Sequence, residues 1–187
     1  MKNFFIFLIF IGFIACNHTL TPEEKQEYSD KGKEIAQVSF NALSEKLTEQ
    51  MKTGGTDKAI PFCNVEALPI TQQLSEKYNV TIKRTSDKLR NQKNKPTERE
   101  LKIINDFNKL ISNKQEIKAI VEIDSNNKKH FYAPIILKAN CLVCHGKVGE
   151  LVTVKTDSII KSLYVNDQAI GYQEGDLRGI WSIAFKK

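Results

Sequence analysis

The sequence predicts an α+β fold in which helices come first and an antiparallel sheet follows. Two capping-box sequences each precede a run of apolar residues at helical spacing, as expected of amphipathic helices. Further along, segments with alternating apolar and polar residues indicate strands, and two of them are joined by Ser125-Asn126-Asn127, a sequence typical of a hairpin turn. These patterns indicate one domain with helices packed on an antiparallel sheet.

The first helix is predicted to be long and to begin after Thr21. Thr21 is a good N-cap residue, Pro22 suits the first helical position, and Glu24 can complete the capping box. Gly54-Gly55 is expected to end this helix. Its apolar positions at helical spacing are Phe40, Leu43, Leu47 and Met51.

A second helical segment is predicted at residues 57–78, with a bend near Pro69. The apolar face of this segment is expected to contain Ile60, Cys63, Ala67, Ile70 and Leu74. Cys63 is therefore predicted to face the core.

The next elements follow from similar local patterns. Alternating residues from Val80 to Arg84 predict a strand, and the polar residues 85–96 predict a long loop. Thr97 and Glu100 form the second capping box, so a third helix is expected after them. Residues 117–123 and 130–137 predict the β-hairpin, residues around 159–163 a short helix, and residues 178–185 a final strand.

The segment Cys141-Leu142-Val143-Cys144-His145 has the form C-x-x-C-H, the attachment signature of c-type haem. Two thiols at this spacing can reach both vinyl groups of one porphyrin edge, and the next residue can bind the iron as an axial ligand. Chance produces such a match in about one chain in a thousand of this composition. One haem c is therefore predicted, attached through Cys141 and Cys144 and bound at its iron by His145.

Two other kinds of site can use the same residues. A thioredoxin-like redox pair of Cys141 and Cys144 would lie beside a βαβ pattern in a reducing compartment, and the sequence offers neither. A zinc site could combine Cys63 with the motif cysteines and His145. Zinc ligands usually come as spaced pairs, however, and a histidine directly after a cysteine is poorly placed to complete a tetrahedron.

The N-terminus has the features of a secretion signal. Lys2 precedes an apolar run over residues 4–15, which is too short to span a bilayer as a helix. Cys16 follows a small residue, as at the processing site of a bacterial lipoprotein, so residues 1–15 are predicted to be a signal peptide. Cys16 would then carry lipid and hold the protein on a membrane surface, in the periplasm or outside the cell.

Cleavage after residue 15 would leave a tether at residues 16–20 and a single haem domain at residues 21–187. The mature chain would have 172 residues, enough for one domain with a core. Its 27 basic and 22 acidic residues give a net charge of +5, and the lysines are spread along the chain. This distribution indicates a solvated surface and no nucleic-acid partner.

Four residues are candidates for the second axial ligand of the iron. Met51 also fits the predicted helix core, His18 lies in the tether, and His130 lies on a predicted strand near the motif. Cys63 lies on the buried face of a helix, where its alternative role is that of a small inert core residue. A thiolate from Cys63 would stabilise ferric iron and lower the reduction potential.

Several short sequences accompany residues 141–146: Phe62-Cys63-Asn64, Arg84-Thr85-Ser86, Leu89-Arg90-Asn91, Asn94-x-Pro96, Gly171-Tyr172 and Gly175-Asp176-Leu177-Arg178-Gly179. In this combination the chain resembles the bacterial c-type haem proteins with a PAS-like fold, found alone or as extracytoplasmic sensor modules. The resemblance spans nearly the whole mature domain. It implies a PAS-like antiparallel sheet flanked by helices, with the iron held between His145 and Cys63.

Arg84, Arg90 and Arg178 are candidates to bind the haem propionates, because guanidinium pairs bidentately with carboxylate. Their alternative role is to brace the loop through hydrogen bonds to the backbone. Trp181 and Phe131 are expected to fill the core or to line the haem pocket.

Two functions fit these expectations. In a redox or gas-responsive sensor, reduction would weaken the bond to Cys63, nitric oxide or carbon monoxide could bind, and a partner protein would receive the signal. In a membrane-tethered, low-potential electron-transfer cytochrome, both ligands would stay bound to the iron. A haem enzyme would need an open position with acid–base residues, which two protein ligands would close, so no enzymatic activity is expected.

Overall fold

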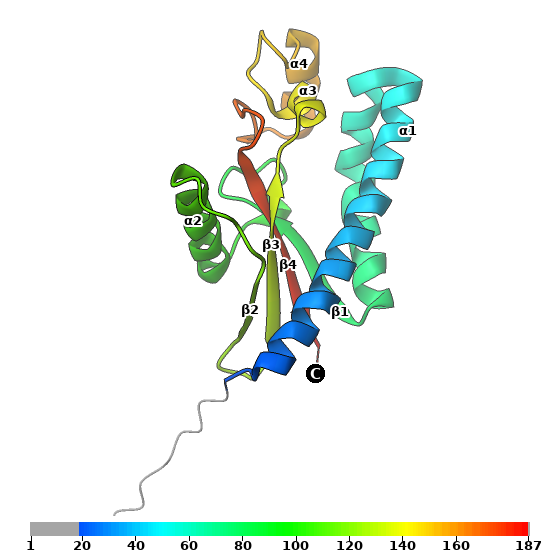
Figure 1. Cartoon of the computed structure of the whole chain (residues 1–187). Coiled ribbons are helices and arrows are strands. Elements are labelled where there is room, and N and C mark those ends of the chain that lie inside the picture. The colour runs from blue at the N-terminus through cyan, green and yellow to red at the C-terminus, as the bar shows by residue number, and fades with distance from the viewer. Residues whose placement is uncertain (1–18, 187) are drawn as a thin grey trace, which may run out of the picture.

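A computed structural model describes residues 19–186, which form a four-stranded sheet with helices on both faces and at one end (Figure 1). The predicted signal peptide, the lipid attachment at Cys16 and the candidate ligand His18 lie outside the described residues. Within residues 19–186, no helix combines the length and the apolar composition needed to cross a bilayer.

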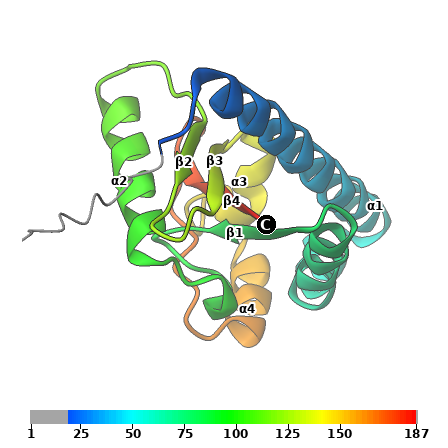
Figure 2. The same ribbon diagram turned by 90° about the horizontal axis from the view of Figure 1, so that it is seen from below.

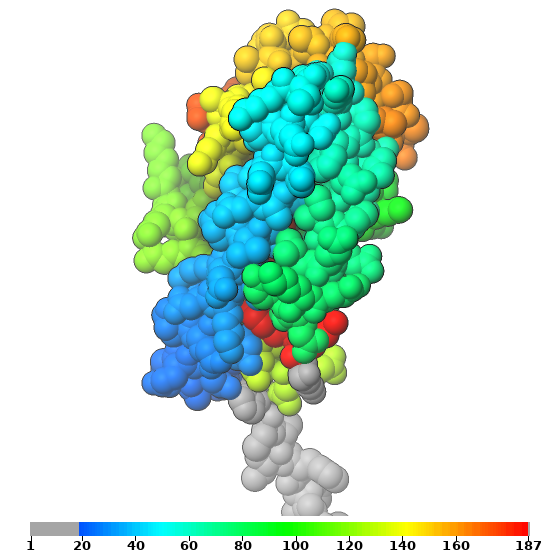
Figure 3. Space-filling view, turned by 90° about the vertical axis from the view of Figure 1, so that its right-hand side faces the viewer, coloured from blue at the N-terminus to red at the C-terminus, as the bar shows by residue number. Residues whose placement is uncertain are grey.

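Helix α1 (Pro22–Lys77) is a helical hairpin. Its N-terminal capping box is formed as predicted, with the Glu24 amide donating to Thr21 Oγ1 over 3.2 Å. The helix breaks at Gly54 and Gly55, and Gly55 has a φ of +60°, which glycine adopts without a Cβ penalty. The two halves then run side by side in opposite directions (Figures 1 and 3). The helix continues through Pro69, where the backbone torsions stay helical, and its break lies at the glycine pair predicted to end the first helix.

The sheet contains β1 (Val80–Thr85), β2 (Ile120–Ile123), β3 (Lys129–Ile136) and β4 (Leu177–Phe185). Its strand order is β1-β4-β3-β2, and every neighbouring pair is antiparallel. The predicted α+β class, with its PAS-like sheet and long N-terminal helix, is therefore confirmed.

The described residues also contain five shorter helical elements: η1 (Gln92–Asn94), α2 (Glu98–Ser112), the adjoining η2 (Ala139–Cys141) and α3 (Leu142–His145), and α4 (Val154–Leu163). The capping box predicted at Thr97 and Glu100 begins α2. Helix α4 begins earlier than predicted, because Thr153 accepts the amide of Thr156 and caps it.

The two faces of the sheet carry different partners, α1 on one and α2 on the other (Figure 2). Ile35, Ala36 and Leu43 of α1 pack against strand residues that include Phe131 and Trp181. On the opposite face, Ile103, Ile104 and Phe107 of α2 pack against Tyr132 and Ile180. Phe131 and Trp181 are thus core residues on the α1 face.

The buried stripe of α1 differs from the predicted one. Phe40 is 49% exposed and Met51 is half-buried, whereas Ser39 is fully buried. The stripe follows Gly32, Ile35, Ser39 and Leu43, which places Phe40 about 100° around the helix from Ser39. Ser39 is tolerated in this stripe because its hydroxyl donates to the Ile35 carbonyl over 2.7 Å.

Gly32 is expected to tolerate no side chain, because a methyl group there would overlap the buried Phe131 ring, with Cδ1 at 2.7 Å. Gly32→Ala should lower the free energy of unfolding by about 1–3 kcal/mol in a chemical denaturation experiment. Alanine is the better helix former, so propensity alone predicts a gain of about 1 kcal/mol and the opposite sign. Lys33→Ala, on the exposed face beside it, is the control and should change stability by about 0.5 kcal/mol or less.

Candidate haem site

The C-x-x-C-H segment lies beyond one end of the sheet, directly after β3, where it forms η2 and α3 (Figure 1). Three other parts of the chain meet it there: the second half of α1, the loop after β1, and the loop at residues 164–176 before β4. The turn end of the α1 hairpin is joined to α4 by a 2.8 Å hydrogen bond between the hydroxyls of Thr56 and Thr156. The predicted ligand residues are therefore gathered from segments far apart in the sequence.

The imidazole of His145 is held by its Nδ1 atom, which donates to the Ala169 carbonyl over 2.7 Å. A carbonyl can only accept, so Nδ1 carries the proton and Nε2 keeps a free lone pair. Burial lowers the pKa of His145 well below its usual value, with further lowering by the charges of Arg90 and Arg178. His145 is therefore a neutral imidazole with Nε2 available to a metal, the arrangement usual for metal-bound histidines.

Residues 164–176 form the wall against which His145 packs. The amide of Tyr172 donates to the His145 carbonyl over 3.0 Å, and the amide of Gly171 donates to the Gly146 carbonyl over 2.9 Å. The Tyr172 ring meets the His145 ring edge-on, with an angle of 88° and centroids 6.3 Å apart. The backbone and ring of His145 are thus both positioned by the same loop.

The two motif cysteines are free thiols and half-buried. Cys144 packs with Ile60 of α1 and with Val152 and Ile160 around α4. Burial raises the pKa of Cys144, so it is a neutral thiol, unlike the low-pKa thiol of a redox dithiol.

Cys63 is a half-buried free thiol one helical turn after Ile60, on the half of α1 that packs beside Cys144. Burial raises the pKa of Cys63, and the charges of Arg84 and Arg90 oppose that rise. Among residues 19–186, no group of three or more His, Cys, Asp or Glu side chains is arranged to hold a metal ion directly. The four residues of the alternative zinc site therefore do not converge on one point.

The three candidate arginines make different contacts. Arg90 pairs with Asp167 and donates to the carbonyls of Cys144 and Ala169, so it braces the loop. Arg178 donates to the Lys88 carbonyl over 3.1 Å and lies over the Tyr172 ring.

Arg84 lies on the α1 face of the sheet, opposite Trp181 in the strand register and 5.8 Å from its ring centroid. Within the described part of the chain its guanidinium has neither a hydrogen bond nor an ion pair. Burial lowers the pKa of Arg84, and its charge acts on both Cys63 and His145. This unpaired cation beside both candidate ligands suits an anionic group such as a propionate.

Of the other ligand candidates, His130 does not share this location. His130 lies on the α2 face near the start of β3, with its Nε2 atom 3.0 Å from Asp124 Oδ2. The strand from His130 to Ile136 then spans about 20 Å before the chain reaches the motif. Met51 lies near the end of the first half of α1, outside the buried clusters.

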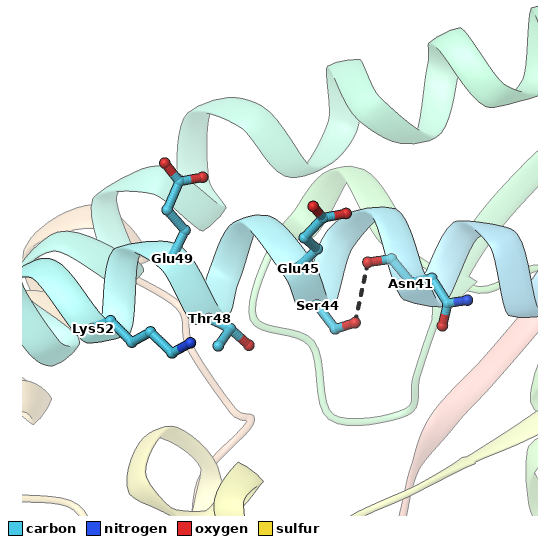
Figure 4. A pocket seen from close by; sticks show the side chains of 6 residues that line it. All are labelled: Asn41, Ser44, Glu45, Thr48, Glu49 and Lys52. Atoms are coloured by element: carbon cyan, nitrogen blue, oxygen red, sulfur yellow. Dashed lines mark hydrogen bonds between the residues drawn. The ribbon is translucent and has the colours of Figure 1, made fainter.

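Two surface hollows are lined neither by Cys63 nor by residues of the motif. The first is a polar strip along the first half of α1, lined by Asn41, Ser44, Glu45, Thr48, Glu49 and Lys52 (Figure 4). The second lies on the α2 face, where Arg99 pairs with Glu122, Lys83 with Glu100 and His130 with Asp124. The charged groups of the second hollow therefore already have partners.

Sequence patterns do not identify the residues that hold His145 in place. Gly171-Tyr172 is one of the short sequences that accompany the motif, but the packing of Tyr172 on the imidazole has no local signal. Ala169 contributes only its backbone carbonyl, and Asp167 acts through Arg90, 77 positions away. Contacts of these kinds produce no periodicity or characteristic spacing in the sequence, so they could not be predicted from it.

Comparison with known proteins gives a family and a fold. A family model described as Tll0287-like matches residues 21–185. The crystal structure of the cyanobacterial heme-protein Tll0287 is similar to this chain, with a TM-score of 0.60 and 22% sequence identity over 90% of this chain and 98% of that one. No curated protein sequence matches the chain.

The tautomer of His145 can be tested in haem-free protein. A long-range ¹H–¹⁵N correlation spectrum should show a protonated Nδ1 and an unprotonated Nε2, because the Ala169 carbonyl accepts the Nδ1 proton. The ring should stay neutral as the pH falls through the usual histidine pKa. His130, which is bonded through Nε2, is the internal reference, and a protonated Nε2 at His145 would contradict the assignment.

Proposed function

Because this chain belongs to the Tll0287-like family, we propose that it is a haem protein with one haem c attached covalently to Cys141 and Cys144. The observation that carries the proposal is the His145 imidazole, anchored at Nδ1 with the Nε2 lone pair free, directly after two unpaired thiols. The similar cyanobacterial protein is a heme-protein, which supports the same cofactor here. When bound, haem would supply one-electron redox chemistry at its iron.

The donor set of the site fits haem c. Thioether links need free thiols, and both motif cysteines are free. Propionates need cationic partners, and Arg84 has an uncommitted guanidinium next to the ligand residues. Arg178 is the second candidate, since a single bond to a backbone carbonyl leaves other N–H groups free. Arg90, by contrast, already pairs with Asp167 and donates to the Cys144 carbonyl.

Cys63 is the proposed second axial ligand. It belongs to α1, whereas His145 belongs to α3, so the iron would link two separate elements. The positive charges of Arg84 and Arg90 favour a thiolate at Cys63 and would help it to bind. A thiolate ligand would keep the potential low.

We propose that the protein is a redox or gas-responsive sensor module with no enzymatic activity. The two ligand elements support this role, because loss of the Cys63 bond would release α1 from the motif while His145 stays fixed to Ala169. A small gaseous molecule could take the vacated position, and the altered α1 would act on a partner protein. Attachment through lipid at Cys16 would place the protein at a membrane surface outside the cytoplasm.

A low-potential electron-transfer cytochrome is the second candidate. The observation that favours it is the exposure of the motif: Val143, between the two cysteines, is 38% exposed. A haem attached there would have an edge close to the surface, which suits electron exchange with a redox partner.

The axial ligand can be tested by expressing the chain with c-type haem maturation machinery. The wild type should hold its pigment in acid acetone, and its oxidised form should give a low-spin electron paramagnetic resonance signal. Cys63→Ala should retain the pigment and lose that low-spin signal, because only the axial thiolate is removed. His130→Ala is the matched control, and its signal should equal that of the wild type.

Colourless protein, or pigment extracted by acid acetone, would disprove covalent attachment. An unchanged low-spin signal in Cys63→Ala would disprove ligation by Cys63 and leave the attachment standing.

Carbon monoxide separates the sensor from the electron carrier. On adding it to the reduced protein, a sensor should show a shifted Soret band, since the bond to Cys63 weakens on reduction. A spectrum unaffected by carbon monoxide would favour the cytochrome. Cys63→Ala serves as the positive control, because its iron has an open position from the start.

A further inference from the structure

Arg90 and Asp167 form the least exposed ion pair within residues 19–186, with side chains 12% and 3% exposed. The pairing is bidentate: Arg90 Nε donates to Asp167 Oδ1 over 3.0 Å, and Nη2 donates to Oδ2 over 3.2 Å. Asp167 Oδ1 also accepts the Ala169 amide over 3.1 Å. The pair therefore joins the loop after β1 to the loop before β4, beside the motif.

Arg90 Nη2 also bonds to the residues that hold His145. Nη2 donates to the Cys144 carbonyl over 2.7 Å and to the Ala169 carbonyl over 3.1 Å. The Ala169 oxygen thus accepts two donors, the Arg90 guanidinium and His145 Nδ1. A cation that shares an acceptor draws electron density from it, so the oxygen pulls less on the Nδ1 proton.

We propose that Arg90, oriented by Asp167, is a positioning residue that fixes the His145 ring and sets how strongly Nε2 donates to the iron. The inference deepens the proposed function and rests on it. A hydrogen bond at Nδ1 raises the basicity of a metal-bound histidine, so a weaker bond makes it a poorer donor. A poorer donor, together with the charge of Arg90 itself, destabilises ferric iron and raises the reduction potential.

Arg90 and Asp167 have opposite effects on the potential. When the Arg90 charge is removed, the Ala169 oxygen accepts more strongly from His145 Nδ1. His145 then becomes a better donor to the iron, so the reduction potential should fall. Removing the Asp167 charge leaves Arg90 as an uncompensated cation, so the potential should rise. A role limited to bracing the loop predicts no such difference, because losing either partner would loosen the same contacts.

The test is a redox titration of the holoprotein as wild type, Arg90→Gln, Asp167→Asn and the double variant. Glutamine keeps a donor and asparagine keeps an acceptor, so each single variant removes mainly charge. We expect the ferrous-to-ferric ratio at a fixed solution potential to fall about tenfold in Arg90→Gln and to rise about tenfold in Asp167→Asn. Each change corresponds to about 59 mV for one electron. The double variant should lie near the wild type.

Lys83→Gln is the matched control. Lys83 pairs with Glu100 on the α2 face of the sheet, in the next least exposed ion pair between separate elements of the described chain. Its loss should reduce stability and leave the potential unchanged. Shifts in the same direction for Arg90→Gln and Asp167→Asn, or no shift in either, would overturn the proposal.

If Arg90→Gln does not accumulate, Asp167→Asn decides alone: a rise in potential supports the proposal, and a fall or no change overturns it. A wild-type protein without covalent pigment would instead overturn the proposed function, and this inference with it. Pigmented protein with the wrong pattern of shifts overturns this inference only.

Discussion

The hydrogen bond from His145 Nδ1 to the Ala169 carbonyl is the contact on which the site depends. It selects the tautomer, it orients the ring, and it exists only because residues 167–172 are bonded to the motif. Backbone bonds from Gly171 and Tyr172 to Gly146 and His145 make that attachment, and Arg90 reinforces it from a third segment. A histidine directly after a cysteine thus becomes a prepared metal ligand through its tertiary neighbours.

The sheet separates two chemically different surfaces. On the α1 face, Arg84 has no anionic partner among the described residues and stands over Trp181, near both candidate ligands. On the α2 face, Lys83 and Glu122 pair with residues in the first turn of α2, and His130 bonds to Asp124 in the hairpin. Strand alternation produces this division, because adjacent residues point to opposite faces. The sheet thus separates these three pairs from Arg84.

Most of the fold could be predicted from the sequence because its signals are local. The capping boxes at Thr21 and Thr97, the Gly54-Gly55 break and the hairpin each depend on a few neighbouring residues. The exposure of Phe40 could not be predicted, since it depends on which side of α1 meets the sheet. For the site, spacing predicts Cys141, Cys144 and His145 as haem residues. The Arg90–Asp167 pair joins positions 77 apart, and Ala169 acts through its backbone, so neither has a sequence pattern.

The hairpin form of α1 also determines which way the molecule points. Its first half, residues 22–53, is a continuous helix about 48 Å long, running from the end of the sheet farthest from α3 to the end nearest it (Figure 1). This helix therefore separates the N-terminal end of the domain from the end that contains α3. A chain anchored through residues that precede Pro22 would carry the C-x-x-C-H segment at the far tip, on the side of the molecule opposite the anchoring surface.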